Sequence, residues 1–323
     1  MSTLATVYTC LGKDWEDLQS LLAHNLQSPI SKIGEVGHYL LQSGGKRIRP
    51  VLHLLTARAL GVTGIAPLQL AVVLEYIHTA TLLHDDVVDK SLLRRGASTA
   101  HAVWGDSTSI LVGDFLYSRA FELLVKLGQM PIMAVLAHTT NQIAEGEVLQ
   151  LELQFKTDLK FETYQEVIRR KTAILFEAAT TLAGILAHSP PSTMEALRIF
   201  GSNFGIAYQW IDDVMDYSAT AEISGKHLGD DLAEGKLTYP VLYALWQATE
   251  SEKAMVETAF QTGDRSAITQ IQALLKRTQA CEYVREQALA LMNAAQAQLS
   301  HLPQNTYCEQ LWLLGELMKQ RNA

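Results

Sequence analysis

The chain has 323 residues, with 26 Lys and Arg against 34 Asp and Glu, so its formal net charge is −8. Hydrophobic residues make up 48% and charged residues 19%, a composition that supports a large core and excludes an intrinsically disordered chain. Because an acidic protein repels phosphate polymers, broad electrostatic binding to nucleic acid is also excluded. An anionic substrate would therefore need metal ions or a local cluster of basic side chains.

Signals for disulfides, secretion and membrane insertion are missing from the sequence. The three cysteines, Cys10, Cys281 and Cys308, form no C-x-x-C pair, which argues against a zinc site and a disulfide framework. The N-terminal segment lacks the basic and apolar regions of a signal peptide. No apolar run reaches the roughly 18 residues that span a bilayer. These features predict a cytoplasmic protein with no transmembrane segment.

Helix-forming patterns dominate the chain. Apolar residues recur at three- and four-residue steps, as in amphipathic helices, whereas short alternating β-branched runs are almost absent. In chain order, the breaks between the predicted helices are Gly44–Gly45, Gly61–Pro67, Arg94–Ser98, Gly128–Pro131, His188–Ser192, Ser218–Tyr239, Gly263–Asp264 and His301–Asn305. None resembles an interdomain linker, so we predict an all-α protein with one large helical domain, residues 1–323. The longest break, Ser218–Tyr239, is polar and favours a functional role such as a lid.

Two aspartate clusters with the same D-D-x-x-D spacing each follow apolar helical sequence. They are Asp85, Asp86 and Asp89 in the first and Asp212, Asp213 and Asp216 in the second. On a helix, the first and last aspartates of a cluster lie one turn apart on the same face, where their like charges repel unless a cation neutralises them. Mg²⁺ prefers carboxylates and usually bridges them to substrate phosphates. A solvated helix end or an N-cap would explain one cluster, but the repeat favours two groups of ligands that hold Mg²⁺ around one diphosphate.

Basic residues accompany both clusters. Arg94 and Arg95 follow the first, Lys226 and Lys236 follow the second, and the segment GGKRIRP at 44–50 places three cations beside a glycine pair. Arginine makes bidentate contacts with phosphate, and lysine acts as a point charge. Although a single Lys or Arg is usually a solvated surface group, this grouping indicates two anion sites, one shared with metal ions and one built from side chains alone.

Eight ordered motifs connect these residues to a known family. They are GGKRIRP (44–50), LLHDDVVD (82–89), RRG (94–96), LVGDFLYSRAF (111–121), AEGEVLQL (144–151), KTAILFEAA (171–179), YQWIDDVMDY (208–217) and GKHLGDDLAEGKLTYP (225–240). With these motifs the sequence resembles the trans-isoprenyl diphosphate synthases, most closely the bacterial long-chain, octaprenyl-type polyprenyl diphosphate synthases. The resemblance runs from about Gly34 to Pro240, and it implies the isoprenoid synthase fold, a helical bundle around a central apolar cavity.

The resemblance also implies roles for individual residues. The two aspartate clusters would bind about three Mg²⁺ ions and the allylic diphosphate. The isopentenyl diphosphate site would consist of Lys46, Arg49, His78 and Arg95. The catalytic residues would be Lys171, Thr172, Gln209 and Lys226, and the allylic diphosphate would contact the two lysines together with Arg94 and Lys236. From the residues alone, His78 and Gln209 could instead be polar groups with hydrogen-bond partners in a helical core. Tyr208 and Trp210 depart from the family's pattern.

The implied reaction joins isopentenyl diphosphate to an allylic primer, expected to be farnesyl diphosphate. Ionisation of the allylic C–O bond would leave a carbocation and a diphosphate, the double bond of isopentenyl diphosphate would attack the cation, and a proton would then be lost. The growing chain should follow an apolar tunnel past Ala80 and Thr81, about 6–7.5 Å along the helix from Asp85. In the family, aromatic residues there stop elongation. The two small side chains therefore predict an all-trans product of about C40, as in quinone side chains.

Three alternative functions fit the sequence less well. A terpene cyclase also ionises an allylic diphosphate, but it has no use for a second-substrate site at Lys46–Arg49 and Arg95 and usually lacks the second complete D-D-x-x-D. A non-catalytic subunit would be expected to have lost aspartates, and a generic helical scaffold leaves the ordered motifs unexplained. The favoured interpretation is a Mg²⁺-dependent, homodimeric prenyltransferase, with the ubiquinone and menaquinone pathways both open.

Overall fold

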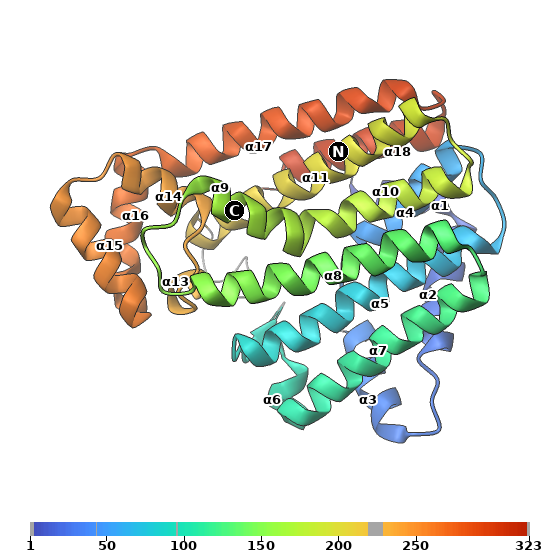
Figure 1. The fold of residues 1–323 in the computed structure, drawn as a ribbon, viewed down its shortest axis with the longest axis horizontal. Helices are drawn as coiled ribbons and strands as arrows, with labels where there is room; N and C mark the ends of the chain where they lie inside the picture. Colours follow the sequence, from blue (N-terminus) through green and yellow to red (C-terminus); the bar gives the residue numbers. More distant parts are fainter. Residues whose placement is uncertain (1–2, 43, 95, 219–228, 322–323) are drawn as a thin grey trace. The chain divides into compact units, whose positions relative to one another are not determined.

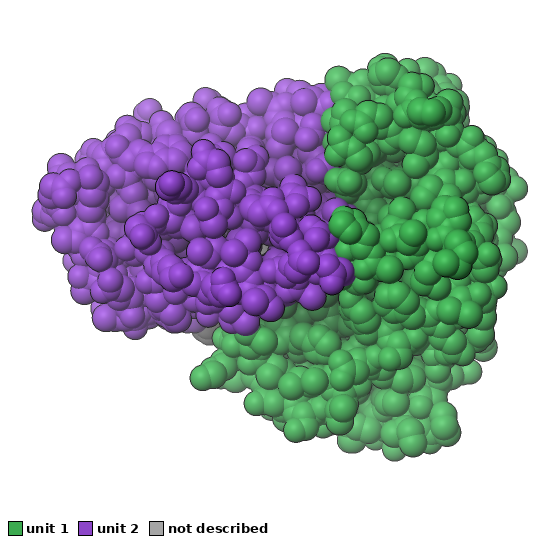
Figure 2. Space-filling model, in the orientation of Figure 1, with its two compact units in different colours: residues 1–140, 175–201, 296–317 green, residues 141–174, 202–295, 318–323 purple. Residues whose placement is uncertain are grey.

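The computed structural model describes residues 3–42, 44–94, 96–218 and 229–321. Arg95, Lys226 and part of the predicted lid lie outside these ranges. The chain forms two compact units, residues 1–140, 175–201 and 296–317 in unit 1 and residues 141–174, 202–295 and 318–323 in unit 2 (Figure 2). Because several helices contribute residues to both units, the unit boundary is not an interdomain linker, and the single domain over 1–323 stays a prediction.

Helices make up almost all of the described secondary structure, which confirms the all-α prediction (Figure 1). The first elements are α1 (Leu4–Leu11), α2 (Lys13–Asn25), α3 (Ser31–Gln42), α4 (Ile48–Ala59), α5 (Ile65–Val88), β1 (Leu93–Arg94), β2 (Ala97–Ser98), α6 (Ala100–Trp104), α7 (Asp106–Leu127) and α8 (Met130–Leu153). The others are α9 (Phe161–Ile168), η1 (Arg169–Ala173), α10 (Ile174–Leu186), α11 (Pro191–Ser218), α13 (Asp230–Ala233), α14 (Tyr239–Trp246), α15 (Glu250–Thr262), η2 (Arg265–Ala267), α16 (Ile268–Arg277), α17 (Ala280–Ala297), η3 (Gln298–His301) and α18 (Thr306–Lys319). Strands β1 and β2 form a short antiparallel hairpin at the predicted break after the first aspartate cluster.

Helix α5 is the core helix of unit 1. The residues from Leu70 to Ile77 are all buried, so this third of the helix is enclosed on every side instead of burying one face as its periodicity suggested. It packs against α4 and α7 (Figure 1). Among the described residues, α5 alone is long and apolar enough to cross a membrane, but 61% of that stretch is buried inside the protein. Its hydropathy therefore reflects a buried core position, and its last turn carries the first aspartate cluster.

Aromatic side chains form much of the core of unit 2. The Tyr239 ring lies 4.6 Å from the Phe161 ring and 5.1 Å from the Trp210 ring, measured between centroids. The Tyr243 and Tyr283 rings stack at 3.9 Å. Trp210 is only 7% exposed, so its departure from the family's pattern serves core packing. This packing holds one face of α11, the helix that carries the second aspartate cluster.

Several helix ends coincide with the predicted breaks, while other breaks were missed. Helices α7 and α15 end before Gly128 and Gly263, whose φ angles of 69° and 61° suit glycine. The gap between α8 and α9 was not predicted. There Phe155 adopts a φ of 63°, and its N–H donates to the Gly235 carbonyl oxygen at 2.9 Å. This contact joins distant parts of the chain, so no local pattern could indicate it.

Candidate active site

The first aspartate cluster contains carboxylates in two different environments. Asp85 and Asp89 are partly exposed, and the Asp89 N–H donates to the Asp85 carbonyl oxygen at 2.8 Å, which confirms that they lie one turn apart. Asp86 is 4% exposed, and its Oδ1 accepts from Arg94 Nε at 2.8 Å and pairs with Nη2 at 2.7 Å. Burial raises the pKa of Asp86. One aspartate is therefore an inward anchor for Arg94, while the outer two remain accessible.

The second cluster repeats this division on α11. Asp212 and Asp216 are partly exposed, whereas Asp213 is 2% exposed. Gln209 Nε2 donates to Asp213 Oδ1 at 2.9 Å, and the Tyr164 hydroxyl donates to the other carboxylate oxygen. Burial raises the pKa of Asp213 to about 7. The middle aspartate of each cluster is thus enclosed by partners, and the outer pair stays partly exposed.

A C-terminal arginine also contacts the second cluster. Arg321 Nη1 lies 2.7 Å from Asp212 Oδ1, and the guanidinium stacks over the Tyr208 ring at 4.6 Å. Tyr208, which departs from the family's pattern, therefore packs against Arg321 in unit 2. The sequence offered no signal for Arg321, because the segment around it carries no motif. The Arg321 guanidinium therefore forms an ion pair with a carboxylate that is predicted to bind Mg²⁺.

Three of the predicted catalytic residues lie together in unit 2. Lys171 and Thr172 belong to the π-helical turn η1, a geometry often found at functional sites. Lys171 Nζ donates to Glu147 Oε2 at 2.6 Å, and Thr172 Oγ1 donates to Gln209 Oε1 at 3.0 Å. Because Gln209 also donates to Asp213, a chain of hydrogen bonds connects the π-helical turn with the second cluster. Glu147 lies in the motif AEGEVLQL, yet the sequence did not reveal its partner.

The three cations of the basic segment 44–50, at the start of α4, have two different roles. Lys46 is exposed, and Arg49 is partly exposed with its guanidinium 4.3 Å above the Phe176 ring. Arg47 is 8% exposed, has a φ of 45° and forms an ion pair with the buried Glu75 of α5. Arg47 is therefore a structural cation, and only its two neighbours remain candidates for phosphate contact.

The surroundings of the remaining predicted residues do not test their roles. His78 and Thr81 are partly exposed on α5, and the Thr81 hydroxyl donates to the His78 carbonyl oxygen at 2.8 Å. Ala80 is fully buried. Lys236 pairs with Glu234 at 2.7 Å in unit 2. Their roles in substrate binding and chain length stay predictions.

The donor chemistry of both clusters fits Mg²⁺. Each cluster offers carboxylate oxygens on two partly exposed side chains one turn apart. Within the described ranges, no three His, Cys, Asp or Glu side chains converge into a ready-made metal site. Mg²⁺ does not need one, because it usually binds one or two carboxylates together with water and substrate phosphates.

Comparisons with known proteins agree with the motifs and the fold. The family model described as polyprenyl synthetase matches residues 30–278. Octaprenyl diphosphate synthase of Escherichia coli (strain K12) is 42% identical over 96% of this chain and 97% of its own length. All-trans-nonaprenyl-diphosphate synthase (geranyl-diphosphate specific) of Rhodobacter capsulatus is 40% identical over 96% of each chain. The solved polyprenyl synthase from Caulobacter crescentus CB15, complexed with calcium and isoprenyl diphosphate, superposes with a TM-score of 0.95 at 37% identity, covering 99% of this chain and 98% of its own. The chain therefore belongs to the polyprenyl synthetase family and has the isoprenoid synthase fold.

Proposed function

We propose that this protein condenses isopentenyl diphosphate with an allylic diphosphate primer and releases a long-chain all-trans polyprenyl diphosphate. Its enzyme class, a trans-polyprenyl diphosphate synthase, follows from near-full-length similarity to octaprenyl and nonaprenyl diphosphate synthases. The observation that carries the mechanism is the arrangement shared by both clusters, a buried central aspartate between two partly exposed ones. The two partly exposed aspartates of each cluster suit the binding of a metal–diphosphate complex.

The outer aspartates are the proposed metal ligands, namely Asp85, Asp89, Asp212 and Asp216. They would hold about three Mg²⁺ ions, which when bound supply positive charge that stabilises the departing diphosphate. The central aspartates have a different task. In this proposal Asp86 orients Arg94 and Asp213 orients Gln209, whereas the sequence analysis expected all six aspartates to bind the metal ions.

The remaining residues bind and position the two substrates. Arg94 and Lys171 contact the allylic diphosphate, together with Lys226 and Lys236. Lys46, Arg49, His78 and Arg95 hold isopentenyl diphosphate beside the allylic carbon, which supplies much of the rate by proximity. Thr172 and Gln209, which are hydrogen-bonded to each other, are proposed to lie beside the reacting carbons, and the released diphosphate accepts the proton.

The product is proposed to be about C40, with farnesyl diphosphate as the primer and a quinone as the final acceptor of the chain. Because Ala80 and Thr81 are small, no bulky side chain at these positions would stop elongation. Relatives named for octaprenyl and nonaprenyl products support a long chain. We place this reaction in the cytoplasm.

A homodimer is part of the same proposal. Helix α7 exposes large apolar side chains, including Leu111 at 66% and Val125 at 67%. They are fourteen residues apart, about four helical turns, and so lie on nearly the same face. An exposed apolar face of this kind suits a second copy of the chain, as sedimentation analysis of the purified protein can test.

The decisive experiment incubates the purified protein with labelled isopentenyl diphosphate, farnesyl diphosphate and Mg²⁺, and sizes the products by reversed-phase chromatography. We expect a product distribution centred near C40. Asp85→Asn should abolish it, and Asp158→Asn, at an exposed aspartate outside both clusters, should leave it unchanged. Absence of any polymer would refute the synthase, whereas a hydrocarbon formed from farnesyl diphosphate alone would favour a terpene cyclase.

A further inference from the structure

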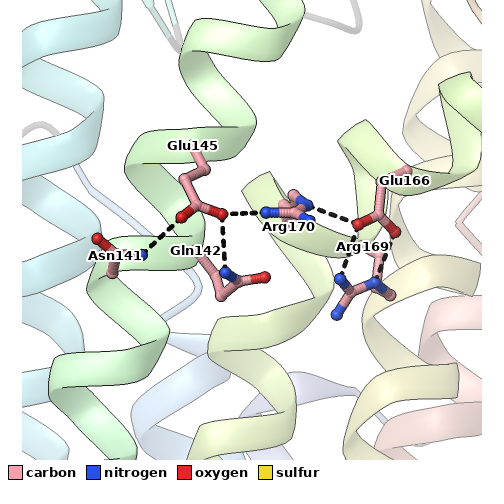
Figure 3. Close-up of polar contacts among 6 residues, drawn as sticks. All are labelled: Asn141, Gln142, Glu145, Glu166, Arg169 and Arg170. Carbon is pink, nitrogen blue, oxygen red and sulfur yellow. Dashed lines mark hydrogen bonds and ion pairs between the residues drawn. The ribbon is translucent and has the colours of Figure 1, made fainter.

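Ion pairs fasten the π-helical turn η1 to its neighbours. In Figure 3, Arg170 of η1 lies between Glu145 of α8 and Glu166 of α9. Arg170 Nε donates to Glu166 at 2.5 Å, and Arg169 donates to the same carboxylate through two hydrogen bonds of 2.8 Å. The backbone just before Lys171 is therefore held by two carboxylates from two helices.

A glycine lets α8 approach this turn closely. A Cβ atom at Gly146 would lie 2.8 Å from the Cβ of Arg170 and 2.9 Å from the backbone N of Lys171. Real Cβ atoms do not approach other heavy atoms so closely, so α8 and η1 could not keep this separation with a larger residue. The next residue, Glu147, reaches Lys171 Nζ at 2.6 Å, with the two side chains only 27% and 19% exposed.

The close approach gives Lys171 a defined direction. Its neighbour Thr172 points to Gln209, while Lys171 itself is held by Glu147. We propose that Glu147 is a positioning residue, whose carboxylate fixes the Lys171 ammonium where it meets the allylic diphosphate. This inference rests on the proposed function, because the contact between Lys171 and the diphosphate belongs to it.

Preorganisation is the physical reason for the effect. A lysine side chain is flexible, and a partner that already orders it removes part of the entropic cost of ordering it when substrate binds. Competition acts in the opposite direction, because a carboxylate at 2.6 Å and the diphosphate would bind the same ammonium. The two effects have opposite signs in the KM for the primer, so a kinetic measurement separates them.

The test is the isosteric variant Glu147→Gln. We expect the KM for the allylic primer to rise about tenfold, as for the loss of one charge-assisted hydrogen bond, while the KM for isopentenyl diphosphate and the Tm stay unchanged. Glu147→Asp should recover part of the affinity. The matched control is Glu145→Gln, on the same helix and facing the same turn, which should change either KM by less than about twofold because Arg170 keeps Glu166.

Each outcome has a separate meaning. An unchanged or lower primer KM in Glu147→Gln would overturn the inference, and so would an equal effect of Glu145→Gln, which would indicate general loosening of the turn. In Lys171→Met, adding Glu147→Gln should have no further effect. If Lys171→Met itself left the primer KM unchanged, the proposed role of Lys171 would be wrong. If it raised the KM but Glu147→Gln did not, only the inference would be wrong.

Discussion

The ion pair between Arg94 and Asp86 provides a quantitative test of whether the first cluster has one buried carboxylate and two partly exposed ones. Arg94→Met removes the cation and leaves a carboxylate that is 4% exposed without its partner. Removing one member of a buried ion pair costs about 3–5 kcal/mol. Because the Arg94 side chain is 28% exposed, we expect the lower end, about 3 kcal/mol at pH 8. Without Arg94 the folded-state pKa of Asp86 rises further above its unfolded value, so the cost should shrink as the pH falls and this carboxyl becomes protonated.

Urea denaturation followed by circular dichroism in EDTA measures this free energy of unfolding. Adding Asp86→Asn to Arg94→Met should restore most of the loss, because the unpaired charge is gone. Adding Asp85→Asn should restore little, since Asp85 is partly exposed and is not the partner of Arg94 in this pair. Equal rescue by the two aspartate substitutions would show that the assignment of an inward and an outward carboxylate is wrong.

Other parts of the molecule give three further tests. His53 is buried with its Nδ1 2.8 Å from the Ala179 carbonyl oxygen, and burial lowers its pKa from 6.5 to about 4. Because the unfolded chain binds this proton first, His53 should contribute a loss of about 2 kcal/mol as the pH falls from 7.5 to 5, and parallel pH–stability curves for wild type and His53→Gln would contradict this. Ala80→Phe should shorten the polyprenyl product in the chromatographic assay, and unchanged chain length would refute the tunnel assignment. Arg321→Ala should lower the Mg²⁺ concentration needed for half-maximal thermal stabilisation, because Asp212 no longer has to release a guanidinium; an unchanged midpoint would count against competition between the two cations.

The sequence could predict features that depend on local spacing. The one-turn separation of Asp85 and Asp89 follows from helix geometry, and the structure confirms it. The inward direction of Asp213 could not be predicted, since it depends on Tyr164, which lies 49 residues away in sequence. Arg47 illustrates the same limit, because only its tertiary partner distinguishes it from the two cations beside it in the motif.

Each cluster has a buried central aspartate between two partly exposed ones, but the partners of the central aspartate differ. This difference affects how much negative charge each cluster presents to a metal ion. In the first, the central aspartate pairs with a cation, Arg94. In the second, the hydrogen-bond partners of Asp213, Gln209 and Tyr164, are neutral, and burial raises the pKa of Asp213 to about 7. Arg321 further neutralises Asp212. A metal ion that binds the outer aspartates of the second cluster must therefore displace the Arg321 guanidinium from Asp212. Because a bound cation favours the ionised form of the neighbouring Asp213, metal binding there should depend on pH near neutrality.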